Sequence, residues 1–481
     1  MSMRQKVLRG AMWSAAEKWG AQLASTAVFL LLARLLDAEA FGLIALANVF
    51  LSFVQILLDQ GFAQAIVQRE HLDPEHLDTA FWTSVSMGVV FVLATLVGAG
   101  QMAAFYQEPT LTPIIQGMSF SFLFAGVSSV HSAILQREMQ FKAFAVRSLL
   151  ATVACGMAGV GAALLGLGVW SLVVKELVFG STASLLLWTQ CHWRPGFQVS
   201  IDHFKDLFSF GINIVGFNFL NFLNRHSDDM LIGYFLGSVA LGYYSVAYRL
   251  LLIMGQLFTK ITTQVSLPTF SKFQSQPDKM RSMYYKVTKL TSLVSFPAFM
   301  ALAVMAPELI RFFFGEQWMP SVPVMRILAF SGVLQSIYAF NGTVLLAMNK
   351  PFWRLILQCT TALANVAVFA VVVRWGIAAV AMGYVVRGYL FSPLPLLMIR
   401  KLLNIDLKKY VEQYAPSILG CLAMAISIFG VKALISPNVE DLVLIIISAL
   451  AGTLAYATAV VLVYPQIFQH IKTNILALAR N

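Results

Sequence analysis

Apolar stretches of about 20 residues recur along the whole chain, and they constrain its fold more than any other feature, because one such stretch crosses a bilayer as a helix. Of the 481 residues, 59% are hydrophobic and only 11% are charged, whereas about a quarter are charged in soluble domains. We therefore predict an all-α polytopic membrane protein with about fourteen transmembrane helices, at residues 11–34, 41–64, 79–103, 112–135, 143–164, 168–190, 208–235, 240–262, 286–306, 322–347, 353–373, 377–399, 411–432 and 441–463.

Basic residues concentrate in alternate connections between these spans. They lie before the first span, around 137–147, in 272–289 and in 400–409, and cytoplasmic loops of membrane proteins carry such an excess. An even number of spans then places both termini in the cytoplasm. The net charge of +11 is explained by these loops, so we expect no nucleic-acid partner. The acidic stretch REHLDPEHLD (69–78) is an exception in a connection assigned to the cytoplasm.

An internal repeat relates the two halves of the chain. Residues 33–48 match residues 233–248 at an offset of 200, with identities that include Gly42 and Gly242, and a second match has an offset of 210. Each repeat holds six spans, which predicts two lobes that enter the membrane in the same sense, with a transport pathway between them. We expect lobes at 1–200 and 201–405, and two further helices with a tail at 406–481.

A charged stripe interrupts the apolar stretch GINIVGFNFLNFLNRHSDDMLIG (211–233). At about 100° per residue the polar side chains share roughly a third of the helix surface, and they are Asn218, Asn221, Arg225, Asp228 and Asp229. Charges in a spanning helix avoid lipid and face other helices or a watery cavity. The stripe is either a substrate or ion site in a transport pathway, or an internal pairing of Arg225 with the aspartates that fixes helix packing.

Further charges fall inside predicted spans. Arg249 and Arg387 lie near the middle of their spans, where each could line the substrate cavity. The alternative for Arg249 is an ion pair with Asp228 or Asp229, and for Arg387 it is simple packing with Tyr384 and Tyr389. Lys18 and Glu17 lie in the first span, where Lys18 can extend to the interface. Asp59 lies near the end of the second span, where water contact is the simpler interpretation.

The chain resembles one family over nearly its whole length. It is similar to the polysaccharide transporters (Wzx-type oligosaccharide flippases) of the multidrug/oligosaccharidyl-lipid/polysaccharide exporter superfamily, and most of all to colanic-acid exporters and lipopolysaccharide-biosynthesis transporters. The stretches that carry the resemblance are GAMWSA (10–15), LARLLDAEAFGL (32–43), DQGFAQAIVQRE (59–70), LQREMQF (135–141), RPGF (194–197), NFLNRHSDDMLIGYFLG (221–237), LGYYSVAYRL (241–250), LPTFSKFQ (267–274) and FGEQWMPSVPVMRIL (314–328).

The resemblance implies two six-helix lobes around a central cavity, with two C-terminal helices beside them. It also implies export of undecaprenyl-pyrophosphate-linked oligosaccharide repeat units across the bacterial inner membrane, by alternating access, for exopolysaccharide or lipopolysaccharide biosynthesis. Polysaccharide polymerase machinery is then a candidate protein partner. Since a guanidinium fork suits phosphate oxygens, we expect a substrate cavity lined by Arg225, Arg249, Arg387, Lys18, Asn218 and Asn221.

No motif for catalysis or for ATP hydrolysis occurs in the sequence, so we expect neither an enzyme nor a cofactor or metal site. Energy would come from H⁺ or Na⁺ coupling, with four acidic candidates: Asp228, Asp229, Glu17 and Asp59. Two other functions stay open. One is an ion-coupled multidrug or cation antiporter of the same superfamily, which the mostly basic intramembrane charges disfavour. The other is a membrane glycosyltransferase or polymerase, which would ordinarily carry a large external loop.

Overall fold

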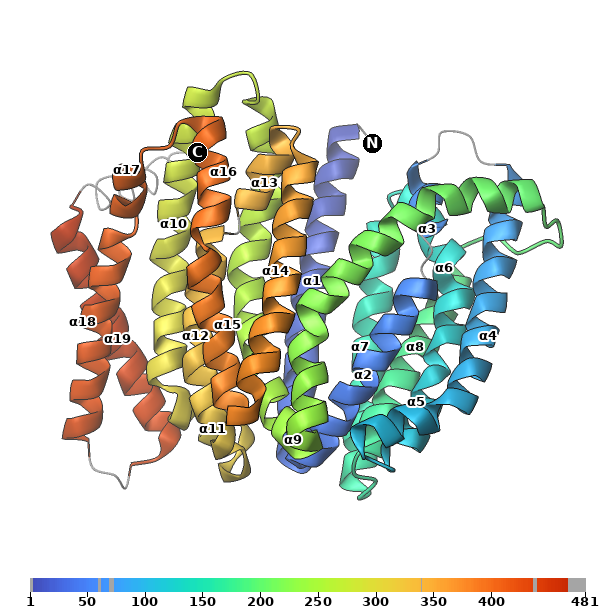
Figure 1. Ribbon diagram of the computed structural model, residues 1–481, viewed down its shortest axis with the longest axis horizontal. Coiled ribbons are helices and arrows are strands. Elements are labelled where there is room, and N and C mark those ends of the chain that lie inside the picture. Colours follow the sequence, from blue (N-terminus) through green and yellow to red (C-terminus); the bar gives the residue numbers. More distant parts are fainter. Residues whose placement is uncertain (1–2, 59–61, 69–72, 339, 436–438, 466–481) are drawn as a thin grey trace. The chain divides into compact units, whose positions relative to one another are not determined.

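The computed structural model describes residues 3–58, 62–68, 73–338, 340–435 and 439–465, with side chains throughout except at 3–18, 141, 203–204, 206–214 and 257–269. All regular structure in these ranges is helical (Figure 1). The chain forms two compact units, residues 1–245 and 246–481. The predicted lobe limits, 1–200, 201–405 and 406–481, stay a prediction.

The first unit consists of eight helices and the first part of a ninth. Their bounds are α1 (Met3–Leu35), α2 (Ala38–Leu58), α3 (Phe62–Gln68), α4 (Pro74–Tyr106), α5 (Leu111–Ser119), α6 (Ser121–Arg137), α7 (Phe141–Leu164), α8 (Trp170–Gln190) and α9 (Ile201–Lys272). The helix α7 packs along both α1 and α8, and α4 packs on α6. An aromatic cluster of Phe81, Trp188 and Trp193 surrounds His131 at one end of this unit.

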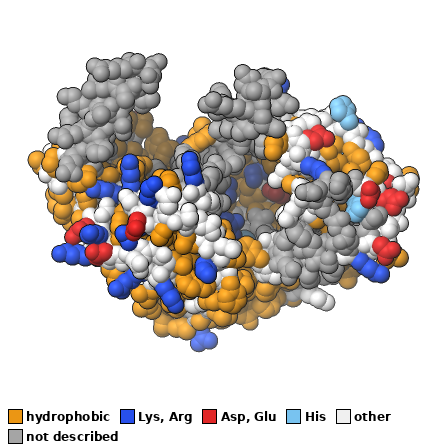
Figure 2. Space-filling model, turned by 90° about the horizontal axis from the view of Figure 1, so that it is seen from above, with side chains coloured by type: hydrophobic (Ala, Val, Ile, Leu, Met, Phe, Trp, Pro, Cys, Tyr) orange, Lys and Arg blue, Asp and Glu red, His pale blue; other side chains and the backbone are white. Residues whose placement is uncertain are grey.

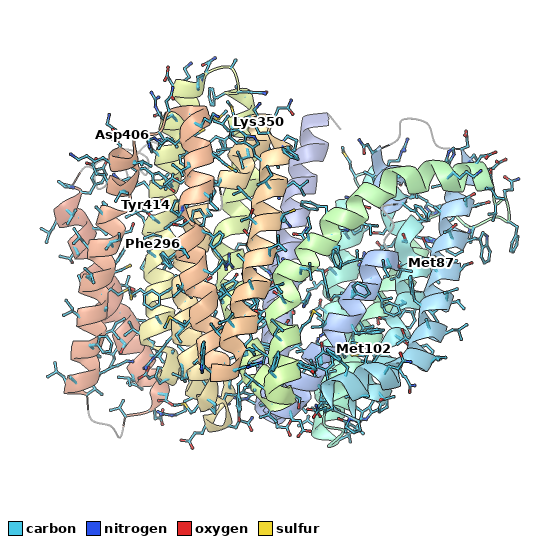
Figure 3. All side chains as sticks on the ribbon, in the orientation of Figure 1. Met87, Met102, Phe296, Lys350, Asp406 and Tyr414 are labelled. Carbon is cyan, nitrogen blue, oxygen red and sulfur yellow. The ribbon has the colours of Figure 1, made fainter. Side chains whose placement is uncertain are left out.

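The second unit begins within α9 and continues to the end of the described chain. Its further elements are α10 (Pro277–Val304), α11 (Ala306–Phe314), η1 (Glu316–Ser321), α12 (Val322–Tyr338), α13 (Asn341–Ala347), α14 (Pro351–Val372), η2 (Val373–Trp375), α15 (Ile377–Phe391), α16 (Pro393–Leu403), α17 (Leu407–Glu412), α18 (Ala415–Leu434) and α19 (Asp441–Val463). The hairpin of α18 and α19 packs on α10, where the rings of Phe296 and Tyr414 stack at 5.8 Å (Figure 3).

Twelve helical segments are long and apolar enough to cross a membrane in the described part of the chain, so the exact count of about fourteen stays a prediction. The difference has two sources. For the first expected span, α1 runs from Met3 to Leu35, but only its part Trp19–Leu35 has described side chains. The expected spans at 208–235 and 240–262 fall in one 42-residue segment, Val215–Gln256, because the break inside α9 is confined to Gly237.

Gly237 turns the chain sharply. Its φ of 82° and ψ of 178° are non-helical and suit glycine, which has no Cβ. Across this residue the Tyr244 hydroxyl donates a 2.8 Å hydrogen bond to the Asp228 carboxylate, although sixteen positions separate the two. Sixteen residues of straight helix would span about 24 Å. The two arms of α9 therefore fold back on each other at Gly237.

The positions matched by the sequence repeat contact each other reciprocally in the first unit. A Cβ on Gly42 would lie 1.8 Å from the Ser238 carbonyl oxygen, and a Cβ on Gly242 would lie 1.8 Å from the Ala38 carbonyl oxygen. Residues 38 and 238, and 42 and 242, are equivalent at the offset of 200. The start of α2 and the second arm of α9 thus cross with approximate two-fold symmetry, at a distance that only glycine permits.

The connection between α8 and α9 is held against the start of α4. The buried Asp78 carboxylate accepts hydrogen bonds from the backbone N–H of Gly196 at 2.9 Å and of Gln198 at 3.4 Å. The Trp82 indole N–H donates to the Gly196 carbonyl at 2.7 Å, and its ring stacks on Phe197. This extended stretch, residues 191–200, therefore has a defined path, which fixes where α9 begins.

Candidate functional site: charged arms of α9 and a polar cavity

The charged stripe on the first arm of α9 is built around two adjacent aspartates with different partners. Asp228 is only 3% exposed and is held by Tyr244 from the second arm. The Asp229 carboxylate lies 3.2 Å from the Nδ1 atom of His226, one helical turn earlier. Because the two side chains point in different directions on the helix, one carboxylate joins the two arms and the other stays on its own arm.

Arg225 does not join this arrangement. Its side chain is exposed, and it forms no ion pair with any residue whose side chain is described. The pairing of Arg225 with the aspartates, which the spacing allows, is thus replaced by the contacts to His226 and Tyr244. An exposed guanidinium in a spanning segment is available to an anionic group outside the protein.

Arg387 lies in the second unit among aromatic and amide side chains. It is 9% exposed, and its guanidinium carbon is 5.2 Å from the centroid of the Tyr384 ring. The Tyr384 hydroxyl accepts a 3.5 Å hydrogen bond from Gln335, and its ring meets Tyr248 edge-on at 6.2 Å. Residues of α9, α12 and α15 therefore meet around this arginine.

Arg249 is next to Tyr248 on α9 and is exposed. The approach of Arg225, Arg249 and Arg387 to one head group stays a prediction.

A polar cavity of about 600 Å³ opens inside the first unit. It contains Asn218, one of the predicted cavity residues, at the wall contributed by α9. Two charged side chains also line it, Arg147 from α7 and Glu176 from α8. The remaining polar lining comes from α2, α6 and α8, namely Asn48, Ser52 and Gln55 of α2, Ser121, Ser128, Ser129 and Ser132 of α6, and Ser184 of α8.

The spacing of the polar residues along α6 and α2 explains why they line the same cavity. Ser121, Ser128 and Ser132 are seven and four residues apart on α6, so they share one face. Asn48, Ser52 and Gln55 are four and three apart on α2 and do the same. Phe122, Phe124 and Phe179 complete the walls. A cavity that combines hydroxyl, amide and aromatic groups can bind a ligand that is itself rich in hydroxyl groups.

Of the two charged residues of this cavity, Arg147 is missed by the sequence analysis as a site residue, and Glu176 stands out there only as a charge inside a predicted span. Arg147 was grouped with the basic turn near residues 137–147, but it lies within the spanning segment Lys142–Leu164. Glu176 lies within the segment Trp170–Gln190. The serine spacing of α6 was the available signal, because a polar stripe on a spanning helix has to face the interior.

Three predicted residues cannot be placed. Asp59 lies outside the described residues, and the side chains of Glu17 and Lys18 lie outside the described side chains. Asn221 is partly buried on the first arm of α9. Among the residues that the structure describes, no group of three or more His, Cys, Asp or Glu side chains could hold a metal ion.

Comparison with known proteins identifies related sequences along most of the chain. The family described as "Polysaccharide biosynthesis protein" matches residues 31–323. Teichuronic acid biosynthesis protein TuaB of Bacillus subtilis (strain 168) is 27% identical over 473 residues, 97% of each chain. Lipopolysaccharide biosynthesis protein WzxC of Escherichia coli (strain K12) is 28% identical over 362 residues, 73% of this chain and 72% of that protein.

A third related sequence and one solved structure are also similar to this chain. Succinoglycan biosynthesis transport protein ExoT of Rhizobium meliloti (strain 1021) is 27% identical over 329 residues, 68% of this chain and 67% of that protein. Among solved structures, a lipid II flippase MurJ in an inward closed conformation has a TM-score of 0.80 at 14% identity, and the match covers 95% of this chain and all of that one. At this identity the likeness establishes a common fold.

Proposed function

The chain belongs to the polysaccharide biosynthesis protein family, and from that premise we propose that it is a flippase. It carries undecaprenyl-pyrophosphate-linked oligosaccharide repeat units across the bacterial cytoplasmic (inner) membrane, for exopolysaccharide or lipopolysaccharide biosynthesis. It works by alternating access and catalyses no covalent step. The names of its relatives support this assignment, since they place TuaB, WzxC and ExoT in the biosynthesis or transport of surface polysaccharides.

The observation that carries the proposal is the polar cavity among membrane-spanning helices of the first unit. Its serine, asparagine and glutamine side chains offer paired donors and acceptors for sugar hydroxyl groups. The same cavity also contains Glu176 and phenylalanine side chains, so the number of serine and amide groups is what favours a sugar over a lipophilic drug cation. Arg147 and Glu176 add one positive and one negative charge to this lining.

The arginines of the second arm of α9 and of α15 have a separate role in this proposal. Arg249 and Arg387, together with Arg225, attract the pyrophosphate group, whose oxygens match the planar guanidinium fork. The carboxylates Asp228 and Asp229 bind a proton or a sodium ion in part of the cycle. Their contacts to Tyr244 and His226 connect this event to the geometry of α9.

The test is a deletion of the gene followed by mass spectrometry of the lipid-linked oligosaccharides in the cytoplasmic membrane. We expect one undecaprenyl-pyrophosphate repeat unit to accumulate while its polymer disappears from the cell surface.

Complementation of the deletion strain with Arg147→Gln should leave the defect in place at a normal protein level. Complementation with Lys142→Gln, which changes an exposed residue of the same helix, should restore the polymer.

An unchanged lipid-linked pool in the deletion strain, together with altered sensitivity to cationic drugs, would replace this proposal with the antiporter alternative. Arg225→Ala provides a second check. Normal polymer at a normal level of that variant would remove Arg225 from the mechanism.

A further inference from the structure

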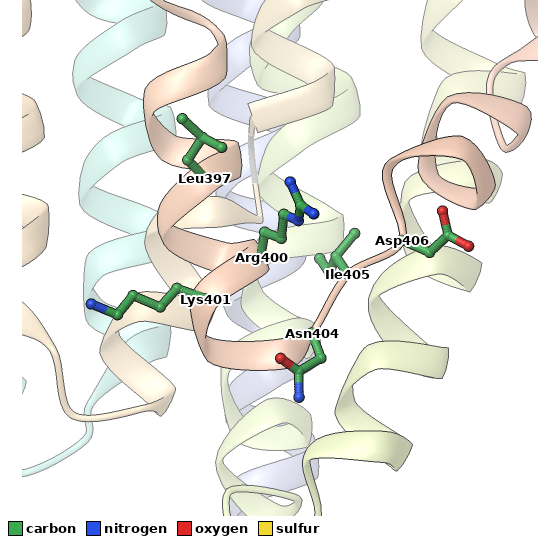
Figure 4. Close-up of a pocket in the computed structure, with 6 residues that line it drawn as sticks. All are labelled: Leu397, Arg400, Lys401, Asn404, Ile405 and Asp406. Atoms are coloured by element: carbon green, nitrogen blue, oxygen red, sulfur yellow. The ribbon is translucent and has the colours of Figure 1, made fainter.

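A second pocket lies in the second unit, at the end of α16, and has a different chemical character. It has a volume of about 440 Å³ and is lined by Leu397, Arg400, Lys401, Asn404, Ile405 and Asp406 (Figure 4). The first three residues belong to the last two turns of α16, and the others form the corner that leads into α17. Neither the proposed transport mechanism nor the sequence resemblance uses these residues.

The corner that forms one wall of the pocket is held in place by α10. The Tyr285 hydroxyl accepts a hydrogen bond from the Asp406 backbone N–H at 2.9 Å and donates one to the Asp406 carbonyl at 3.3 Å. Arg281 donates to the Leu403 carbonyl at 3.4 Å. Ile405, 2% exposed, fixes the corner in the core. The pocket is therefore shaped before any ligand arrives.

The positive charges of this pocket are not neutralised by its own aspartate. The Asp406 carboxylate accepts hydrogen bonds from the backbone N–H groups of Lys408 and Lys409, and in Figure 4 it is directed away from Arg400. Arg400 forms no ion pair with a residue in the described ranges. The Lys401 amine lies 6.0 Å from the centroid of the Trp353 ring. Two adjacent cations thus remain available to an anion.

The pocket also lies at the boundary of an apolar surface. Its helix α16 ends the apolar spanning segment Ile377–Leu403, so the pocket is at the level where a span leaves the membrane. Leu394 and Leu397 are 40% and 52% exposed, and their spacing to Lys401 places all three on one side of α16. Figure 2 shows Lys and Arg side chains gathered on the face of the molecule that contains this end of α16.

We propose that this pocket binds an anionic glycerophospholipid of the surrounding bilayer, with the phosphate at Arg400 and Lys401 and the acyl chains along Leu394 and Leu397. Basic pockets between helices on the cytoplasmic side of membrane proteins bind such head groups. A free phosphate would use the cations alone, whereas a phospholipid also covers the exposed leucines, and this difference favours the lipid. The bound lipid would link α16 to the corner before α17.

Native mass spectrometry of the full-length protein released from detergent tests this proposal. Dipalmitoyl phosphatidylglycerol is the probe, phosphatidylethanolamine with the same chains is the zwitterionic comparison, and inorganic phosphate is the soluble one. We expect phosphatidylglycerol to be retained, and the double variant Arg400→Gln/Lys401→Gln to bind it about 30-fold more weakly, since each cation near a membrane surface contributes roughly a factor of five.

The matched control is Lys408→Gln/Lys409→Gln, which removes the same charge from exposed positions just outside the pocket. This control should change phosphatidylglycerol binding less than threefold. Equal losses in the two double variants would show general attraction to the basic surface and overturn the proposal. Retention of phosphatidylethanolamine at the same level, or displacement of phosphatidylglycerol by millimolar phosphate alone, would overturn it as well.

Leu397→Gln separates the lipid from a free anion, because it should weaken phosphatidylglycerol retention without changing the charge. These results are independent of the polymer assay for the proposed function, since lipid retention is measured on the purified protein.

Discussion

At the scale of single residues, function depends on polar groups whose partners are distant in the sequence. Asp228 is the clearest example. The pattern in residues 211–233 identifies it as an unusual intramembrane charge, but its partner Tyr244 follows the turn at Gly237. A buried carboxylate that loses its hydrogen-bond donor destabilises the folded state, because neither water nor packing replaces the lost hydrogen bond. The Tyr244 hydroxyl therefore contributes to the stability of the α9 hairpin.

Tyr244→Phe should lower the free energy of unfolding by about 1–3 kcal/mol, since it leaves the Asp228 carboxylate without its side-chain donor in a buried site. Thermal unfolding of the purified protein in detergent measures this change. Tyr234→Phe is the matched control, because Tyr234 is exposed and contacts Phe105 through its ring alone in the described contacts. Equal unfolding temperatures for the two variants would contradict the assigned role of Tyr244.

Gly42→Ala and Gly242→Ala should each sharply reduce the amount of folded protein, because the new Cβ would overlap a backbone carbonyl oxygen of the partner helix. Fluorescence-detected size-exclusion chromatography of a tagged protein gives the folded yield. Gly98→Ala and Gly100→Ala on α4 are controls, since nothing lies within 4 Å of their new Cβ atoms. Alanine favours a helix there by up to about 1 kcal/mol. A folded yield for Gly42→Ala equal to that of the controls would refute the close contact.

At the scale of helices, the α18–α19 hairpin is attached to α11 and α10 by polar contacts near both of its ends. Lys432 donates to Glu308 at 2.7 Å and to the Val304 carbonyl at 2.8 Å. Arg311 pairs with Asp441 at 3.2 Å, and the Tyr456 hydroxyl donates to the Leu293 carbonyl at 2.7 Å. The hairpin is therefore an integral part of the second unit.

Lys432→Met should destabilise the protein more than Arg311→Met. The Lys432–Glu308 pair is mostly buried, with side chains 18% and 13% exposed. Removing Lys432 leaves the buried Glu308 carboxylate without its partner and lowers the free energy of unfolding by about 3 kcal/mol. The Arg311–Asp441 pair is more exposed and contributes at most about 1 kcal/mol. A double-mutant cycle of thermal stability with Glu308→Gln measures the coupling. A coupling energy for Lys432 and Glu308 no larger than that for Arg311 and Asp441 would contradict the ranking.

At the scale of the whole molecule, the distribution of basic residues predicts which ends of the helices face the cytoplasm. The connection between α9 and α10 is flanked by Lys272, Lys279 and Arg281, whereas the connection between α14 and α15 carries only Arg374, within η2. Three spanning segments, Pro277–Val304, Glu316–Ala347 and Pro351–Trp375, lie between these two connections. The two connections should therefore lie on different sides of the membrane.

A single cysteine at position 275 should react with a membrane-impermeant maleimide only after the cells are permeabilised. A single cysteine at position 375, introduced as Trp375→Cys, should react in intact cells, because this exposed side chain follows position 275 after three spanning segments. Both variants carry serine at the four native cysteine positions. Labelling of position 275 in intact cells would reverse the predicted orientation.

The sequence alone determined that this chain is a helical membrane protein, where most of its spans lie and which family it belongs to, because hydrophobicity, charge excess and local motifs are properties of neighbouring residues. It also located the unusual polar residues of α9. Only the tertiary structure decided their partners: Tyr244 for Asp228, and Arg147 and Glu176 beside Asn218 in one cavity. These groups lie 16 to 71 positions apart in the chain, so their arrangement depends on how whole helices pack, and no local pattern encodes that packing.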